Sequence, residues 1–384
     1  MKLTAQVKLQ PTPDQRVLLD RTLRAANAAC TFASRVAWES KTFRQFALHK
    51  RVYREIRTRF HLSAQLAIRV IAKVADAYKA GRTGERTFRP RGSFPYDVRI
   101  LSWKVAERTV SIWTLGGRQV IPFVCGERQQ AWLDSQQGET DLVSRDGAFY
   151  LLATCVVAEV PAIRPTDVLG VDLGIRNLAV DSDGTRYSGA HILSLRHRHR
   201  RLRTKLQSQG TRAAKRRLRL RRRKERRFQA DVNHCISKQL VASAQGTRRA
   251  IALEDLQGIR QRVSVRRAQR ATLHSWAFGQ LRAFVDYKAR LAGVPVVLVD
   301  PRYTSQRCPA CGYTARANRP SQSRFCCVAC GFAGLADHLA AENIRRAAVN
   351  QPDVARDDVQ APIPSKRRTA TERSSKLPAG AGSS

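Results

Sequence analysis

Five of the nine cysteines lie within 23 residues of each other, and four of them form two matching motifs. The motifs are Cys308-Pro-Ala-Cys311-Gly and Cys327-Val-Ala-Cys330-Gly, with 15 residues between Cys311 and Cys327. Each motif lets two thiolates of one tight turn face the same ion, and two such turns make a tetrahedral four-thiolate zinc site. A four-cysteine site has no open coordination position, so the pattern predicts one structural zinc ion.

Cys326 leaves the choice of zinc ligands open, because it would satisfy a looser C-x3-C spacing with Cys330. Using it would break the match between the two motifs, and we therefore interpret Cys326 as a bystander. Four-cysteine ribbons also occur in ribosomal and transcription proteins, so the zinc site by itself does not indicate a function.

Three carboxylates at the ends of apolar segments could bind a different metal. Asp172 follows "LGV", Glu254 follows "IAL", and Asp337 begins a helical segment beyond the second cysteine motif. Singly, such an acid is usually a helix cap or a solvated turn. Hydrolysis of a phosphodiester by two-metal chemistry, however, requires carboxylates that converge on ions about 3.5–4 Å apart, and Mg²⁺ prefers oxygen ligands. Together the three acids predict a nuclease site that binds two Mg²⁺ ions.

The elements that must position these acids follow one another in the order of a ribonuclease-H-like fold. In chain order we expect a buried strand at 167–174, a hairpin at 177–189, a strand at 249–255, a helix at 272–292, a strand at 294–300 and a helix at 336–349. Asp183-Gly184 is a hairpin turn signal, and Gly293 is a typical helix end.

The first 165 residues have a different pattern. Residues 1–10 alternate like a strand, and a helical region opens at "PTPDQ" and extends to about residue 80. Residues 87–160 are rich in β-branched and aromatic residues, which predicts short antiparallel strands in a small barrel with Trp103 and Trp113 in its core. If residues 1–10 pair with these strands, the helical region is an insertion into the barrel.

The chain is strongly basic, with 70 Lys and Arg against 30 Asp and Glu among 384 residues and a formal net charge of +40. Such a chain would repel itself without a polyanion, so we expect a nucleic-acid partner. Residues 196–227 hold 17 basic residues and one acid, Glu225, which suggests a helix that lies along a phosphate backbone. The arginines expected to contact nucleic acid are Arg200, Arg201, Arg203, Arg216, Arg217, Arg221, Arg222 and Arg223.

The remaining cysteines are scattered and do not form an even disulfide framework, which suits a reducing cytosol. The start has no apolar signal core and no apolar run approaches ~18 residues, so no membrane partner is expected. Residues 350–384 mix Pro, Ser and Ala with charges and are expected to be disordered. His234 has no metal partner nearby in sequence, and we expect it to be structural.

Several of these segments resemble the RuvC-type nuclease of TnpB proteins, which insertion sequences encode and which are often described as OrfB transposases. The segments are "LGVDLGIRNLAV", "DVNHCISKQLV", "ALEDLQGI", "SWAFGQLRAFVDYKARLAG", "VDPRYTSQRCPACG" and "FCCVACGFAGLADHLAAENI". Type V CRISPR effectors are similar in the same blocks. The amino terminus also resembles TnpB, so the resemblance covers nearly the whole chain except the tail and is most specific between 166 and 348.

The resemblance implies an Mg²⁺-dependent, RNA-guided DNA endonuclease of bacteria or archaea, found in the cytoplasm with the nucleoid. Its partners would be a guide RNA derived from the flanking element and double-stranded target DNA. The RuvC acids would be Asp172, Glu254 and Asp337, and the two cysteine motifs would hold the zinc ion. One position departs from the family pattern D-x-N-A-A: Leu339 stands in the place of its asparagine and removes a polar neighbour of the site. Residues 303–306 match a family block to which no chemistry can be assigned.

The predicted fold class is α+β multidomain, with a small β-barrel that carries a helical insertion, followed by a ribonuclease-H-like (RuvC) α/β domain with an inserted zinc ribbon. The predicted parts are a wedge-type barrel at 1–10 and 87–165, a helical recognition insertion at 11–86, a RuvC-like domain at 166–300 with an Arg-rich helix at 194–228, a zinc ribbon at 301–332, the last RuvC helix at 333–349 and a disordered tail at 350–384.

Three alternatives remain open at this stage. The chain could be a nuclease-dead, RNA-guided DNA-binding repressor, although its three acids are intact. It could be a transposase that transfers strands with the same fold. It could also be a structural RNA-binding protein with a zinc ribbon, which would leave the acids unexplained.

Overall fold

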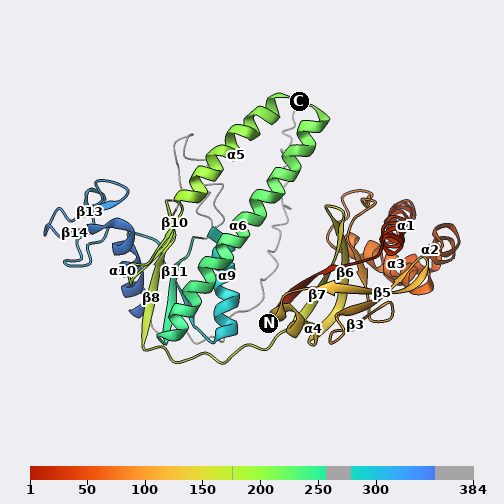
Figure 1. Cartoon of the computed structure of the whole chain (residues 1–384), viewed down its shortest axis with the longest axis horizontal. Coiled ribbons are helices and arrows are strands. Elements are labelled where there is room, and N and C mark those ends of the chain that lie inside the picture. The colour runs from red at the N-terminus through yellow and green to blue at the C-terminus, as the bar shows by residue number, and fades with distance from the viewer. Residues whose placement is uncertain (175, 257–277, 351–384) are drawn as a thin grey trace, which may run out of the picture. The chain divides into compact units, whose positions relative to one another are not determined.

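The computed structural model describes residues 1–174, 176–256 and 278–350 and divides into two compact units, Met1–Val160 and Pro161–Ser384 (Figure 1). Each unit has a hydrophobic core of its own. The tail predicted to be disordered and the first turns of the helix predicted at 272–292 lie outside the described residues. None of the described helices combines the length and the apolar character needed to cross a membrane.

The first unit is built on a seven-stranded sheet with the strand order β2-β6-β7-β1-β5-β4-β3. Its strands are β1 Lys2–Leu9, β2 Phe94–Tyr96, β3 Leu101–Lys104, β4 Thr109–Thr114, β5 Gly117–Val124, β6 Gln136–Arg145 and β7 Ala148–Val156. The predicted pairing of the first residues is confirmed, since β1 is antiparallel to both β5 and β7. The sheet comes close to the predicted barrel, but among the described strands β2 and β3 are its two edges and do not pair with each other, so the barrel is not closed.

Three helices separate β1 from β2 in the chain: α1 Pro13–Glu39, α2 Gln45–Phe60 and α3 Ala64–Lys79. The predicted start of α1 is confirmed, because Thr12 caps it in a capping box with Gln15. Trp103 and Trp113 pack against the core of this unit, as expected. The short helix α4 (Glu127–Leu133) was not predicted, since it interrupts a region otherwise rich in strand-forming residues.

The second unit is built on a five-stranded sheet with the strand order β10-β9-β8-β11-β12. Its strands are β8 Asp167–Asp172, β9 Asn177–Asp181, β10 Arg186–Ser188, β11 Arg249–Glu254 and β12 Val296–Val299, all at predicted positions. β8, β11 and β12 are parallel, β9 is antiparallel to β8, and β10 is antiparallel to β9. The central residues of β8 and β11 are buried, which explains why both strands read as continuous apolar runs.

Helices cover both faces of this sheet. Helix α6 (Arg212–Gly246) and helix α9 (Phe278–Ala292) pack on the face that carries Leu169 and Leu253. Helix α10 (Ala336–Val349) packs on the other face, which carries Val168 and Ala252.

Gly170 of β8 lies directly under α10. A Cβ atom at this position would lie 2.1 Å from the carbonyl oxygen of Ala341 and 2.6 Å from the backbone nitrogen of Arg345. Only glycine therefore allows α10 to approach the sheet this closely.

The single Arg-rich helix predicted at 194–228 is wrong: the structure has two helices, α5 (Ala190–Ser208) and the first part of α6 (Figure 1). The chain turns at Gly210, which has a φ of +61°, and Thr211 then caps α6 by accepting a hydrogen bond from the backbone of Ala214. The uniform charge of the run concealed this glycine-threonine turn signal.

The segment between β12 and α10 is an irregular ribbon. It contains a short 3-10 helix, η1 (Arg316–Asn318), and a two-stranded antiparallel sheet of β13 (Arg324–Cys326) and β14 (Ala333–Leu335). β14 leads directly into α10, so the ribbon and the helix that carries Asp337 are continuous.

Candidate functional site

The structure brings the three predicted acids together at one edge of the five-stranded sheet. Asp172 is the last residue of β8 and Glu254 is the last residue of β11. Because Val171 pairs with Leu253 in parallel register, the two acids that follow lie side by side. Strand alternation directs both toward the face covered by α10, where Asp337 is the second helical residue.

Burial and repulsion between the acids dominate the electrostatics of this edge. Burial, followed by the charges of Glu254 and Asp337, raises the pKa of Asp172 to about 8, although Arg319 opposes the shift. Burial also raises the pKa of Glu254, against the opposing effects of a hydrogen bond from Thr304 and the charge of Arg319. Cations bound at this edge would relieve the repulsion and favour the charged carboxylates.

The spacing of the acids bears on how many ions they could bind. Ligands of one Mg²⁺ ion lie about 2.0–2.1 Å from it, and hence at most about 4.2 Å from one another. In the described part of the chain, only the thiol cluster below brings three or more ligand atoms of Cys, His, Asp or Glu within 4.8 Å of one another. In this geometry the three carboxylates therefore lie too far apart for all of them to bind one ion.

Both carboxylate oxygens of Asp337 are held by side chains that the sequence patterns did not indicate. Asn177, at the start of β9, donates from Nδ2 to Asp337 Oδ2 at 2.9 Å. Arg319, in the ribbon, donates from Nη2 to Asp337 Oδ1 at 3.0 Å and also to the carbonyl oxygen of Gln322. In the sequence, Arg319 is one of 70 basic residues, and its position there carries no signal.

The block at 303–306, which had no assigned chemistry, supports Glu254. The Thr304 hydroxyl donates a hydrogen bond to Glu254 Oε1. Tyr303 has a positive φ of +63° and begins a turn, since the backbone N–H groups of Gln306 and Arg307 both donate to its carbonyl oxygen. This turn directs the Thr304 side chain toward the sheet edge.

Asn343 of α10 joins this turn to the helix of Asp337. Its buried amide donates to the carbonyl oxygens of Thr304 and Arg307, both at 2.8 Å. The group that positions Glu254 and the helix that carries Asp337 are thus held together by one side chain.

The two cysteine motifs adopt the same turn. In each, the first cysteine donates from its backbone to the residue five positions later, and the glycine donates back to the carbonyl oxygen of the first cysteine. Gly312 and Gly331 have φ values of +75° and +74°, which explains the glycine after each motif. The sequence repeat is therefore also a structural repeat.

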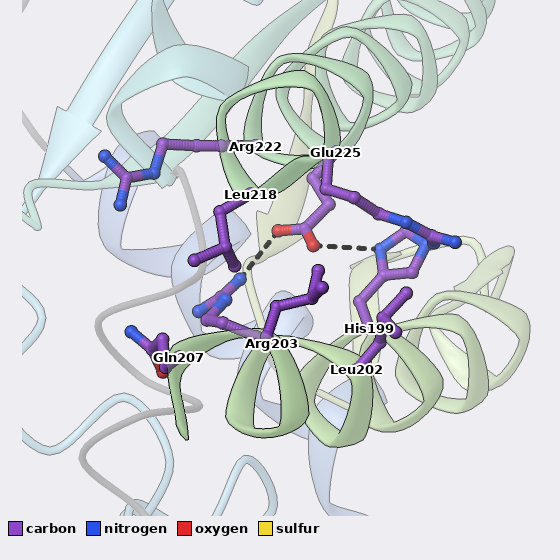
Figure 2. Close-up of a pocket in the computed structure, with 9 residues that line it drawn as sticks. His199, Leu202, Arg203, Gln207, Leu218, Arg222 and Glu225 are labelled. Atoms are coloured by element: carbon purple, nitrogen blue, oxygen red, sulfur yellow. Dashed lines mark hydrogen bonds and ion pairs between the residues drawn. The ribbon is translucent and has the colours of Figure 1, made fainter. Parts of the chain in front are cut away.

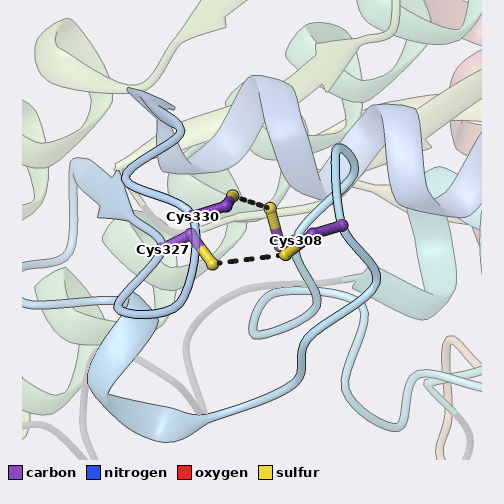
Figure 3. Close-up of side chains that lie close together, drawn as sticks. Cys308, Cys327 and Cys330 are labelled. Carbon is purple, nitrogen blue, oxygen red and sulfur yellow. Dashed lines mark hydrogen bonds between the residues drawn. The ribbon is translucent and has the colours of Figure 1, made fainter.

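The four thiols converge between these turns (Figure 3). The Sγ atoms of Cys308 and Cys330 are 3.7 Å apart, and those of Cys311 and Cys327 are 3.6 Å apart. A tetrahedron with zinc–sulfur bonds of about 2.3 Å has edges of about 3.8 Å, so this cluster could hold one zinc ion. Cys326 is outside the set of four and ends β13 opposite Ala333, which favours the interpretation that it is a bystander.

Leu339, the departure from the family pattern, lies in a small hydrophobic cluster and is buried there with Cys308, Cys327 and Phe325. The side chain therefore packs the ribbon against α10.

His234 of α6 is stacked on Phe284 of α9, with ring centroids 3.8 Å apart. Partial burial and the nearby charge of Lys288 lower its pKa. These contacts support a structural role.

All eight arginines predicted to contact nucleic acid are exposed on α5 and α6. Glu225, the one acid of the run, lies between the helices and pairs with Arg203 at 2.7 Å and His199 at 3.2 Å (Figure 2). Leu202 and Leu218 line the same seam. The hairpin thus joins its two basic helices through one carboxylate and a narrow apolar contact.

Two family models match the chain. Residues 153–257 match OrfB_IS605, described as a probable transposase, and residues 278–344 match the Cas12f1-like TNB domain. These two segments contain all three acids and all four clustered thiols.

Several curated proteins are similar to parts of the chain. The CRISPR-associated endodeoxyribonuclease Cas12f1 of Sulfoacidibacillus thermotolerans is 39% identical over 32% of this chain and 28% of its own length. TnpB-like protein MJ0751 of Methanocaldococcus jannaschii is 34% identical over 32% of this chain and 43% of its own length. The putative RNA-guided DNA endonuclease InsQ of Escherichia coli is 45% identical over 17% of this chain and 16% of its own length. The chain thus spans less than half the length of these relatives.

The match to a solved Cas12f1–sgRNA–target DNA complex covers 90% of this chain and 99% of that chain, with 15% identity and a TM-score of 0.39. The family models match the chain in sequence. The resemblance to TnpB and OrfB proteins that the motifs predicted is therefore confirmed over residues 153–257 and 278–344.

Proposed function

We propose that the chain is an RNA-guided DNA endonuclease encoded by a transposable element, and that it hydrolyses phosphodiester bonds at a RuvC-like site. The observation that carries the proposal is the convergence of Asp172, Glu254 and Asp337 from two strands and a helix. Two family models that match the segments holding these acids support it, as do relatives named as endodeoxyribonucleases or RNA-guided endonucleases.

Magnesium fits the donor set, because three carboxylates offer hard oxygen ligands and the raised pKa of Asp172 marks a place where positive charge is favoured. When bound, two Mg²⁺ ions would supply activation of the attacking water and stabilisation of the leaving oxygen. The protein's part is to hold the ligands: Thr304 orients Glu254, and Asn177 orients Asp337.

Arg319 has a further part in this proposal. Its side chain is three-quarters buried beside Asp337, and its charge lowers the pKa of both Asp172 and Glu254. A guanidinium in this position also offers N–H donors to the oxygens of a phosphate brought to the acids.

The thiol cluster would hold one structural zinc ion, as its sulfur spacing allows. The zinc would fix the ribbon and hence Arg319. We further propose that the seven-stranded sheet is the wedge-type part, that α1, α2 and α3 form the recognition insertion, and that the five-stranded sheet with its helices is the RuvC-like domain.

Base pairing between a guide RNA and the target strand would supply sequence specificity, so the protein would read mainly backbone and shape. The exposed arginines of α5 and α6 would contact the backbone of the guide or of the RNA–DNA duplex. The guide would derive from the element that flanks the gene, and the target would be double-stranded DNA.

The test begins with the RNA that co-purifies with the protein. A discrete species transcribed from the flanking element supports guidance, whereas random RNA indicates charge-driven binding alone. The sequence of the guide RNA is then changed so that it pairs with a target in a plasmid. This plasmid carries a randomised sequence next to the target. We expect cleavage in Mg²⁺ and none in EDTA.

Two variants separate the acids of the site from other acids. Asp172→Asn should abolish cleavage while guided DNA binding is retained. Asp286→Asn makes the same chemical change in a partly exposed i,i+4 ion pair of α9, and this variant should cleave normally. Guided binding without cleavage by the wild type would identify a repressor, and joining of cleaved ends to new DNA would identify a transposase.

A further inference from the structure

A cavity of about 330 Å³ opens in the first unit, far in sequence from the acids and the thiols. It is formed by residues 24–35 of α1, the last turn of α2 and the segment 88–90. Its walls combine three phenylalanines with three arginines: Phe32, Phe60, Phe88, Arg24, Arg35 and Arg59. The proposed nuclease chemistry uses none of these residues.

One wall of the cavity is held in place by a stripe of polar residues on α1. The backbone N–H of Phe88 donates to the Thr31 hydroxyl at 3.1 Å, and the Asn27 amide donates to the carbonyl oxygen of Gly92 at 3.0 Å. The Ser34 hydroxyl accepts from the backbone N–H of Arg86 at 3.0 Å. The segment that presents Phe88 is thus ordered before any ligand arrives, which lowers the entropic cost of binding.

The phenylalanines lie at the border of the core rather than within it. Phe32, Phe60 and Phe88 are each half-buried and pack on the core from outside. The rings of Phe32 and Phe60 are 5.9 Å apart, and the Arg59 guanidinium lies 5.2 Å from the first and 5.6 Å from the second. Simple core packing would not leave three rings and a cation around an open space.

The arginines at the rim differ in how far they are neutralised. Arg24 pairs with Asp20 at 2.7 Å, and Arg59 has a longer contact of 3.5 Å with Glu55. Arg35 makes no ion pair with any residue that the structure describes. The rim can therefore accept an anionic group while the aromatic walls accept a flat apolar one.

We infer that this cavity binds one unstacked nucleotide of a single-stranded segment, with its base against the phenylalanines and its phosphate at Arg35 and Arg59. Aromatic faces beside cations are the combination by which proteins hold single strands. The volume is at the lower end for a ligand pocket and suits one nucleotide. Single strands of RNA and of DNA share this chemistry, and the experiment below distinguishes them. The inference does not depend on cleavage by the acids.

The test measures binding by the full chain in EDTA, so that cleavage plays no part. The probes are labelled 12-mers of oligo-uridine and oligo-thymidine, an abasic 12-mer with the same backbone, a blunt DNA duplex and a peptide of glutamate and phenylalanine. Phe32→Leu keeps an apolar side chain but removes the ring, and Arg35→Ala removes one rim charge. The controls are Phe46→Ala, an exposed ring elsewhere on α2, and Arg21→Ala, an exposed charge elsewhere on α1.

We expect Phe32→Leu to weaken binding of the uridine or thymidine oligomer on the order of 5- to 100-fold, because one stacked base is lost. Its affinity for the abasic oligomer and the duplex should be unchanged, as should all affinities of the Phe46 control. Arg35→Ala should lower the affinity for the oligomers both with and without bases, and the loss should be larger than the loss in Arg21→Ala. If Phe32→Leu loses more affinity for the uridine oligomer than for the thymidine oligomer, the strand is RNA. If it loses more affinity for the thymidine oligomer, the strand is DNA.

Equal losses for abasic and normal oligomers, or no loss in Phe32→Leu, would overturn the inference. The inference would also be overturned if the peptide bound more tightly than either oligomer. A second measurement does not depend on variants: oligomers that carry 5-iodouridine or 5-iodo-deoxyuridine should photo-crosslink to Phe32, Phe60 or Phe88 of the wild-type chain. Crosslinks found only at other residues would contradict the site.

Discussion

Thr304 shows how a residue without reactive chemistry can control one that has it. Glu254 ends a strand, and its carboxylate would be free to rotate at the sheet edge without the hydroxyl that donates to Oε1. The same turn is tied to α10 through Asn343. The orientation of one proposed metal ligand therefore depends on a residue 50 positions away in the chain.

Replacing Thr304 with valine tests this dependence while keeping the shape of the side chain. We expect Thr304→Val to slow single-turnover cleavage by about 10- to 100-fold and to raise the Mg²⁺ concentration needed, since Glu254 loses its fixed orientation. Thr304→Ser keeps the hydroxyl and should recover most of the rate. Equal rates for the valine variant and the wild type would show that Glu254 needs no such support.

Substitution of single cysteines tests which thiols hold the zinc. Metal analysis of the purified protein should find about one zinc per chain in the wild type and in Cys326→Ser. Cys330→Ser should lose most of the zinc, because three thiolates and a hydroxyl bind it less well. If Cys326→Ser lost zinc and Cys330→Ser kept it, the assignment of ligands would be wrong.

The residues of the site divide into those that sequence could indicate and those that it could not. Asp172 and Glu254 stand where apolar strands end, and the two cysteine motifs repeat each other, so their local context marks them. Asn177, Thr304 and Arg319 act only through partners that folding brings close, and polar residues of these types are common along the chain. Their roles therefore needed the structure.

Helix α10 is the element on which the site depends most, since it carries Asp337 and packs on β8 through Gly170. A methyl group at position 170 would overlap backbone atoms of α10, which cannot rotate away as a side chain can. The position of Asp337 relative to Asp172 is thus set by contact between two backbones.

We expect Gly170→Ala to lower the free energy of unfolding by about 2–4 kcal/mol and to abolish most cleavage, because α10 must shift outward. Thermal melts and a cleavage assay measure the two effects. Gly246→Ala at the end of α6 is the control, since a Cβ there meets no atom within 4 Å. It should change stability by no more than about 0.5 kcal/mol. A Gly170→Ala protein with normal stability would contradict the close packing.

The contact between α6 and α9 should be sensitive to acid through His234. Its pKa is lowered in the folded protein, so the unfolded chain takes up a proton at a higher pH than the folded one does. The contribution of neutral His234 to the free energy of unfolding is therefore lost as the pH falls below about 6.5. Because the ring is partly exposed, the change should be only a few tenths of a kcal/mol.

His234→Phe keeps the stack on Phe284 and cannot take up a proton. Urea unfolding between pH 7.5 and 5.5 should show a weaker pH dependence for this variant than for the wild type. His49→Phe, which replaces another stacked histidine in the first unit, is the comparison. An unchanged pH dependence in His234→Phe would remove His234 as the cause.

Most elements could be predicted because their sequence patterns are strong: β8 and β11 are continuous apolar runs, and α10 has a helical period. Two elements were not predicted correctly, each for a local reason. In the Arg-rich run the repeated charge hid the break at Gly210, and α4 is too short for a periodic signal. The close approach of α10 to Gly170 could not be predicted, since a glycine in a strand has several possible causes.

For the molecule as a whole, charge is the dominant property. An excess of 40 positive charges makes binding to any polyanion strong at low salt, so affinity alone says little about guidance. Both the basic hairpin of α5 and α6 and the remaining surface contribute to this background. The salt dependence of the binding affinity can separate the phosphate contacts of particular arginines from the general attraction of the basic surface.

Replacing Arg221, Arg222 and Arg223 with alanine should reduce the slope of log affinity against log salt by up to about 2 for single-stranded RNA. Filter binding between about 0.05 and 0.5 M salt, a tenfold range that includes physiological ionic strength, measures this slope. A double variant, Lys79→Ala and Lys104→Ala, removes charges already paired with Asp76 and Glu107 and should leave the slope unchanged. Equal slopes for the triple variant and the wild type would exclude these arginines as phosphate contacts.

The ion pair between Arg319 and Asp337 joins the two ends of a short stretch of chain that contains the second cysteine motif. The middle of this stretch contributes Cys327 and Cys330 to the thiol cluster, and its two ends lie at the acids. Its length is therefore fixed at both places. Exposed loops usually accept insertions and deletions. Here a gain or loss of even one residue would pull one end out of place, although exposed single positions such as Val328 remain free to vary. Evolution of this surface should therefore proceed by substitution at constant length.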